Sequence, residues 1–274
     1  MISNNQIKGM RIALLFVTSL FLIAFSSSTI QAQVNSGKGY ELLKKVDDNL
    51  KGYEAYTSDM RMVLVKKDGK SFTRNVRTYV KSVPGDGDKV LSIFDSPADI
   101  KGTKLLAYTH LENADDQWLF LPALGRTKRI ANKNQSGSFL GSELAYEDIG
   151  NSWLEKFSYK YIRDDVYEAK PCYVVHAFPR SKYSGYSYLE LWVEKERELV
   201  IYQKYHNRKK ELLKEEFSEY VYLEEGNGWY PSKVLLANRI NGRKTEIQWT
   251  NYKFDVQLND ADFHTGALAR KHQR

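Results

Sequence analysis

The sequence predicts a mainly β protein with one large antiparallel sheet of ten or eleven strands, curled or closed into a barrel. Apolar and polar residues alternate over several short stretches, and turn-forming pairs such as Asp68-Gly69 and Asn241-Gly242 separate these stretches. Such alternation is typical of half-buried strands, and Asp-Gly and Asn-Gly pairs are strong hairpin signals. Only one segment outside the leader has clear helical spacing, so we expect consecutive hairpins in a single domain.

The first thirty residues have the composition of an exported leader. Lys8 and Arg11 precede an uncharged apolar run over residues 12–25, and small residues follow. A basic start, a short apolar core and a small residue at the cleavage point indicate a secretory signal peptide, which we expect to be cleaved after Ala32. A membrane anchor is the alternative, but the run is shorter than the ~20 residues that span a bilayer. We therefore assign residues 1–32 to the signal peptide and residues 33–274 to the mature domain, soluble in the periplasm.

The predicted helix comes first in the mature chain. Tyr40, Leu43, Val46 and Leu50 recur at helical intervals, and Gly52 follows as a stop signal. The pattern then changes to a period of two, which predicts a hairpin over residues 58–81.

Further strands are predicted over residues 90–94, 105–110 and 118–122, each preceded by turn-forming residues, and residues 171–178 form another strand-like run. Residues 185–206 predict two strands around a charged turn, and residues 213–254 place two Asn-Gly pairs between aromatic-rich strands. The segment 207–217 has helix propensity, but turn signals on both sides favour a hairpin.

One long insertion interrupts the strands. Residues 136–157 are rich in Gly and Ser, and their apolar residues lie three or four apart. We expect a loop with one or two short helices that acts as a lid, in which Phe139, Leu140 and Leu144 cover the open side of the barrel. Glu143, Glu147 and Asp148 are expected to face solvent on the outer surface of this lid. A fixed plug would have the same composition.

Charge and cysteine content exclude several classes. The chain carries a net charge of +7, and losing Lys8 and Arg11 with the leader reduces it to +5. The basic residues are scattered, which argues against nucleic acid. Cys172 is the only cysteine, so an intramolecular disulfide is impossible, and no cysteine stands at the cleavage point to carry a lipid anchor. We interpret Cys172 as a buried small hydrophobic residue.

The sequence offers no positive signal for catalysis. No serine lies between glycines in a nucleophile elbow, no Gly-rich phosphate loop follows a strand, and the five histidines are scattered. We therefore expect a protein that is not an enzyme and needs no cofactor or metal, although a triad assembled in space stays possible.

Apolar residues exceed the needs of a plain sheet, since aromatic residues make up 13% of the chain. The concave face of a curled sheet is filled by side chains or encloses a lipid-sized cavity. Strand alternation gives the following candidate lipid-binding residues: Met60, Met62, Leu64, Phe72, Val76, Trp118 and Phe120.

Several segments resemble the outer membrane lipoprotein-sorting protein family of the LolA/LolB-like superfamily. They are DIKGTKLLAY, DDQWLFLPALGRTKRI, SGSFLGSELAYEDI, NRKKELLKEEFSEY, GNGWYPSKVLL and GRKTEIQWTNYKFDVQLNDADF, which together extend over most of the mature chain. The resemblance implies an incomplete antiparallel β-barrel with an N-terminal helix and short helices covering its open side. It also implies a periplasmic carrier of lipid or lipoprotein acyl chains, with an inner-membrane exporter of the resistance–nodulation–division (RND) type as a possible partner.

The resemblance gives a function to the stretch WLFLPALGRTKRI. Its apolar part would be a strand that Pro122 ends at the cavity rim, with Gly125 in the following turn. Arg126, Lys128 and Arg129 would then form a basic rim that meets lipid phosphates or a membrane surface. Carriage toward the outer membrane by a monomer is the leading hypothesis. A partner role beside the exporter and a lipid-cleaving enzyme are the alternatives.

Overall fold

The computed structural model describes residues 37–150 and 154–270 and confirms a mainly β protein. In these described residues, a single antiparallel sheet of thirteen strands is accompanied by one α-helix, α2 (Lys38–Asn49). The signal peptide and its cleavage after Ala32 lie outside the described residues. Within the described part, no helix is both long and apolar enough to cross a membrane.

The strands follow one another along the chain with short connections at most turns. They are β1 (Ala55–Val65), β2 (Ser71–Ser82), β3 (Asp88–Ser96), β4 (Lys104–Tyr108), β5 (Asp116–Leu121), β6 (Arg126–Ile130), β7 (Phe157–Tyr167), β8 (Lys170–Pro179), β9 (Tyr186–Glu194), β10 (Leu199–Asn207), β11 (Leu212–Leu223), β12 (Gly228–Asn238) and β13 (Lys244–Phe254).

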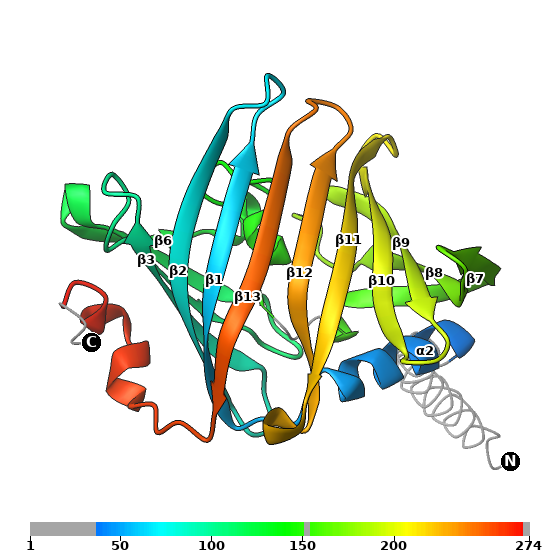
Figure 1. Ribbon diagram of the computed structural model, residues 1–274, viewed down its shortest axis with the longest axis horizontal. Helices are drawn as coiled ribbons and strands as arrows, with labels where there is room; N and C mark the ends of the chain where they lie inside the picture. The colour runs from blue at the N-terminus through cyan, green and yellow to red at the C-terminus, as the bar shows by residue number, and fades with distance from the viewer. Residues whose placement is uncertain (1–36, 151–153, 271–274) are drawn as a thin grey trace, which may run out of the picture. The chain divides into compact units, whose positions relative to one another are not determined.

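The strand order shows an open barrel. The sheet runs from β6 back to β1, continues with β13, and runs back again to β7. Figure 1 shows β1 and β13 side by side in the middle of the curved sheet, whereas β6 and β7 lie at its two edges. The described residues between these edges are 131–150 and 154–156, and residues 131–150 are called the crossing segment below. It contains the 3-10 helices η2 (Asn132–Asn134) and η3 (Tyr146–Asp148).

The Gly- and Asn-containing turns lie where the sequence predicts them. The Asp68-Gly69 turn joins β1 to β2, and Gly69 has a φ of +84°. Asn227 (φ +45°) and Gly242 (φ +73°) occupy the turns that flank β12. Left-handed backbone favours these residue types, so the turns fix the register of their hairpins. The segment 207–217 is also a hairpin, as preferred over a helix.

Thirteen strands exceed the predicted ten or eleven, chiefly because β6 and β7 give weak signals. Strand β6 reads RTKRI and is exposed at four of its five positions, so it shows no apolar alternation. Strand β7 turns into β8 through Glu168 and Ala169, both with positive φ. Neither residue type is typical of such a turn, so the usual hairpin signal is missing there.

Helix α2 packs against the concave face. Leu43 and Val46 are fully buried among apolar residues of β8, β9 and β10, and the helix also contacts β7. It begins two residues before Tyr40 and ends at Asn49, close to the predicted limits. Helix α2 therefore fills part of the concave side that a lone curved sheet would leave open.

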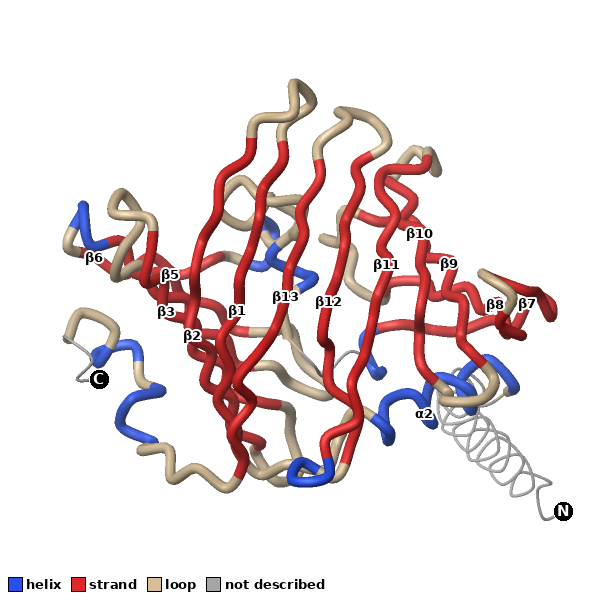
Figure 2. The backbone as a smooth tube through the Cα atoms, viewed as in Figure 1, coloured by secondary structure: helices blue, strands red, loops and turns tan. Residues whose placement is uncertain are grey.

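The outer face carries its own apolar clusters. Two short 3-10 helices, η6 (Asp260–Phe263) and η7 (Thr265–Ala267), place Phe263 and Leu268 against residues of β3 and β4. Figure 2 shows these helices beside the β2–β3 side of the sheet. Cys172 is fully buried in a second outer cluster, which confirms its predicted role as a small hydrophobic residue.

Candidate functional site: an apolar cavity on the concave face

A cavity of about 370 Å³ lies between the concave face of the sheet, helix α2 and the crossing segment. This volume falls within the roughly 300–1,000 Å³ typical of ligand sites. Met60 and Met62 enter it from β1, and Leu189 and Leu191 enter it from β9. The other apolar lining residues include Val46, Leu50, Val80, Val90, Leu105, Ala177, Val200, Val234, Ile247, Trp249 and Tyr252.

The crossing segment closes the cavity with apolar side chains. Phe139 is 3% exposed, and its ring centroid lies 5.9 Å from that of Phe94 and 5.5 Å from that of Tyr146. Leu144 also lines the cavity, and Leu140 packs against the surrounding core. The structure thus brings the three residues of the predicted lid together over the concave face. Their movement stays a prediction.

A buried ion pair fastens the crossing segment to the sheet. The ammonium of Lys214 on β11 lies 2.5 Å from Oδ2 of Asp148 and donates to the backbone oxygen of Glu143 at 2.9 Å. The side chains of Lys214 and Asp148 are only 3% and 7% exposed. Tyr186 donates a further hydrogen bond to Asp148 at 2.8 Å. A buried charge is costly unless it is paired and hydrogen-bonded, and both Lys214 and Asp148 meet this condition.

The expectation that the acids of this segment face water is wrong. The side chain of Glu143 is 7% exposed and lies 3.1 Å from the guanidinium of Arg243. Glu147 lines the cavity and accepts a hydrogen bond from the backbone of Gly185 at 2.8 Å, and burial raises its pKa. Like Asp148, these acids face partners on or next to the strands across the opening, namely Arg243 just before β13 and Gly185 just before β9. Sequence spacing does not reveal these contacts.

A second polar patch lies on the wall formed by β10 and β11. Tyr205 donates to Oε2 of Glu216 at 2.6 Å, and Gln203 donates to the Tyr205 hydroxyl at 2.8 Å. Ser218 donates to Oε1 of Glu216 at 3.1 Å. Burial raises the pKa of Glu216. This patch supplies hydrogen-bond partners from within itself.

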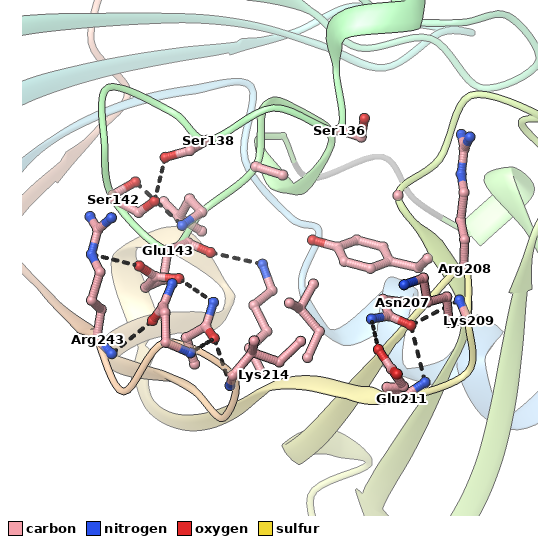
Figure 3. A pocket seen from close by; sticks show the side chains of 18 residues that line it. Ser136, Ser138, Ser142, Glu143, Asn207, Arg208, Lys209, Glu211, Lys214 and Arg243 are labelled. Carbon is pink, nitrogen blue, oxygen red and sulfur yellow. Dashed lines mark hydrogen bonds and ion pairs between the residues drawn. The ribbon is translucent and has the colours of Figure 1, made fainter. Parts of the chain in front are cut away.

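A wider polar groove of about 740 Å³ lies on the other side of the crossing segment. Figure 3 shows Lys214 directed toward Glu143, with Arg243 bound to the same segment. Leu144 and Tyr186 line both the groove and the apolar cavity, so they form part of the wall between the two.

The candidate lipid-binding residues of β1 and β2 do not all lie at the cavity. Met60 and Met62 line the cavity, and Leu64 and Val76 are buried in the apolar core beside it. Phe72 does not belong there. It is 50% exposed near the tip of the β1–β2 hairpin, where little of the chain covers the sheet.

Trp118 and Phe120 lie away from the cavity, so the prediction that they line it is wrong. Both pack in the outer cluster with Phe263, whereas Leu119 between them joins the concave core. Alternation correctly puts Trp118 and Phe120 on one face of β5. It does not reveal which face is concave, and the C-terminal helices cover the face that holds them.

The predicted basic rim lies on an edge strand. Arg126, Lys128 and Arg129 are exposed on β6, and Arg129 pairs with Asp116. Strand β5 ends at Leu121, Pro122 begins a 3-10 helix, and Gly125 turns the chain with a φ of +58°. The strand end and turn therefore match the sequence expectation, while contact with a membrane stays a proposal.

Two features of the site escape sequence reasoning. No sequence pattern indicates the Lys214–Asp148 pair, because Lys214 lies in a run of charged residues. Ser58 and Thr78 line the cavity, and they have the same strand parity as Met60 and Val76. Strand parity alone therefore groups these hydroxyls with the cavity-lining residues, although their side chains are polar. Among residues 37–150 and 154–270, no cluster of His, Cys, Asp or Glu has the geometry of a metal site.

Similarity to known proteins assigns the chain to a family. A family model described only as "Uncharacterized protein" matches residues 86–270. An outer membrane lipoprotein-sorting protein domain from Vibrio parahaemolyticus is 35% identical, with a TM-score of 0.81, and the match covers 85% of this chain and 99% of that one. No curated protein is significantly similar in sequence.

Two further structures agree with this fold. A DUF1329 family protein from Desulfovibrio piger is 31% identical over 84% of this chain and 97% of its own, with a TM-score of 0.78. A LolA superfamily protein from Nitrosomonas europaea shares the fold at 16% identity, over 84% of this chain and 98% of its own, with a TM-score of 0.67. By sequence identity, coverage and fold, the chain belongs to the outer membrane lipoprotein-sorting protein family and has the LolA-like architecture.

Proposed function

We propose that this protein is a non-enzymatic periplasmic carrier that shelters acyl chains of lipids or lipoproteins during transport toward the outer membrane. The observation that supports this most directly is the apolar cavity of about 370 Å³ beneath the crossing segment. The relative from Vibrio parahaemolyticus is described as a lipoprotein-sorting domain, which is consistent with the same class of cargo.

The energetics of such a cavity favour acyl chains. Each methylene transferred from water gains about 0.8 kcal/mol, so a partly filled cavity can hold a chain that would otherwise contact water. Methionines such as Met60 and Met62 adapt to ligands of varied shape. Release then requires an acceptor or a movement of the crossing segment.

Export and membrane contact complete the proposal. The signal peptide over residues 1–32 would deliver residues 33–274 to the periplasm. The exposed basic residues of β6, Arg126, Lys128 and Arg129, would attract the anionic surface of a membrane during loading or delivery.

Native mass spectrometry of protein purified from cells tests the carrier role. We expect the wild type to carry copurified lipid and to accept lipid from vesicles. Met60→Trp should reduce the bound lipid, because it fills a cavity-lining position. Val166→Trp is the matched control, because Val166 is 64% exposed on β7 and should leave loading unchanged. A wild type that never carries or accepts lipid contradicts the proposal.

A further inference from the structure

Three hydroxyl side chains form one row across the cavity wall. Ser58 on β1 pairs in register with Thr78 on β2, and Thr78 pairs with Ser92 on β3. All three line the cavity. The register rows on either side are apolar or aromatic, namely Met60, Val76 and Phe94, and Tyr56, Val80 and Val90.

Two of these hydroxyls lack a hydrogen-bond partner among the residues that the structure describes. Ser58 is 4% exposed and Thr78 is 8% exposed, yet neither Oγ of Ser58 nor Oγ1 of Thr78 is hydrogen-bonded to any described residue. A buried hydroxyl without a partner is unfavourable, so such groups call for a specific explanation. The polar patch around Glu216 is different, because its members bind one another.

The surrounding charges restrict what could bind the row. In the described part of the chain, the charged residues that line the cavity are the acids Glu147, Asp148 and Glu216. Lys214, the cation nearest to them in the network, already binds Asp148. An anionic phosphate would therefore meet acids, and a bare hydrocarbon would leave both hydroxyls unpaired.

We propose that the row formed by Ser58, Thr78 and Ser92 binds uncharged carbonyl oxygens of an ester-linked lipid. This inference rests on the proposed carrier function and names its ligand chemistry. The hydroxyls of Ser58 and Thr78 donate to the ester carbonyls at the head of the acyl chains, while the chains contact the apolar rows on either side. The charged headgroup stays outside the row.

A comparison of two lipids that differ only in this linkage tests the inference. The protein is incubated with vesicles of diester phosphatidylcholine or of diether phosphatidylcholine with the same chain length, and bound lipid is quantified by mass spectrometry. We expect the wild type to retain the diester lipid about tenfold more strongly, since two neutral hydrogen bonds are involved. The double variant Ser58→Ala/Thr78→Val should lose this preference, whereas Ser71→Ala, at an exposed position of β2, should keep it.

The outcomes separate this inference from the carrier function. If the wild type binds both lipids equally well, the hydroxyl row is not a carbonyl site but the carrier stands. A double variant that keeps the ester preference also overturns the inference. If neither lipid binds, both fall together. The wild-type comparison needs no variant, so it decides the matter even if the double variant does not fold.

Phospholipids and the lipid-modified ends of lipoproteins share the ester linkage. Competition with a synthetic diacylated lipopeptide distinguishes these sources. Displacement of the diester lipid by the lipopeptide indicates a site that takes lipoprotein, and its absence indicates a phospholipid site. The ester preference supports the hydroxyl row in either case.

Discussion

The ammonium of Lys214 lies 2.5 Å from the carboxylate of Asp148, and this buried pair joins strand β11 to the crossing segment. Because the segment contributes Phe139 and Leu144 to the cavity, the pair connects an electrostatic contact to the closure of an apolar site. A change at either residue should therefore affect both stability and access to the cavity.

Removal of one partner should be costly. Lys214→Met leaves the Asp148 carboxylate buried without its cation, and we expect a loss of about 3–5 kcal/mol in the free energy of unfolding. Urea unfolding measures it. Lys214→Met/Asp148→Asn should recover much of the loss, since no unpaired charge remains. Lys195→Met, which breaks an exposed pair with Asp164, should cost at most about 1 kcal/mol. Equal losses for the two lysine variants would contradict this role of the buried Lys214–Asp148 pair.

Phe139→Asp tests whether the crossing segment acts as a lid. A carboxylate at this buried position should loosen the segment and increase the binding of an environment-sensitive hydrophobic dye, while far-ultraviolet circular dichroism still reports a folded sheet. Leu140→Ala should act in the same direction, more mildly. Phe72→Asp is the control, because Phe72 is half exposed outside the cavity.

The same experiment can reject the lid. An unchanged dye signal in folded Phe139→Asp protein would remove the role from Phe139. Global unfolding would instead show that the segment is a fixed part of the core, as its contact with Phe94 would then imply.

Glu216 should make stability depend on pH. Burial raises its pKa above the ordinary value of 4.5, so the folded state binds the proton more tightly than the unfolded state. The resulting stabilisation is fully present below the unfolded pKa and is lost as pH rises through the folded pKa. Glu216→Gln should therefore gain stability relative to wild type as pH rises from about 4 to about 8. Thermal unfolding at each pH measures the difference. Glu219→Gln on the exposed side of β11 should show little change, and a similar profile for both would contradict the assignment.

Phe120→Ala should separate folding from lipid binding. Phe120 packs with Phe263 on the outer face, so truncation should cost about 3–5 kcal/mol of stability. Bound lipid per folded molecule should stay at the wild-type value, in contrast to Met60→Trp. Mass spectrometry of the folded fraction measures it, and a selective loss of lipid would return Phe120 to the cavity.

Much of the fold could be predicted because the turns carry their own chemistry. Asp68-Gly69 and the two Asn-Gly pairs mark hairpins through left-handed backbone, and Leu43 and Val46 mark the helix through spacing. The β7–β8 turn at Glu168 and Ala169 could not be found in this way, because its residues do not favour that conformation. Strand β6 could not be found because four of its five side chains are exposed, so apolar alternation is missing.

The site was only partly predictable, for a different reason. Alternation groups residues by face, and it selects Met60 and Met62 correctly as neighbours. It does not indicate which face of β5 is concave, so it predicts Trp118 and Phe120 on the wrong side of the sheet. The Lys214–Asp148 pair depends on residues far apart in sequence meeting across the opening, which no local pattern encodes.

The open barrel leaves two strand edges through which copies of the protein could associate. Within the described residues, strands β6 and β7 each pair on one side only, and an unpaired strand edge can template the addition of another chain. Charged side chains stand on both edges, with Arg126 and Lys128 on β6 and Arg163 and Asp164 on β7. The hydration of these charged side chains opposes edge-to-edge pairing between the sheets of two copies. The basic residues of β6 would therefore keep concentrated protein dispersed even when no membrane is present.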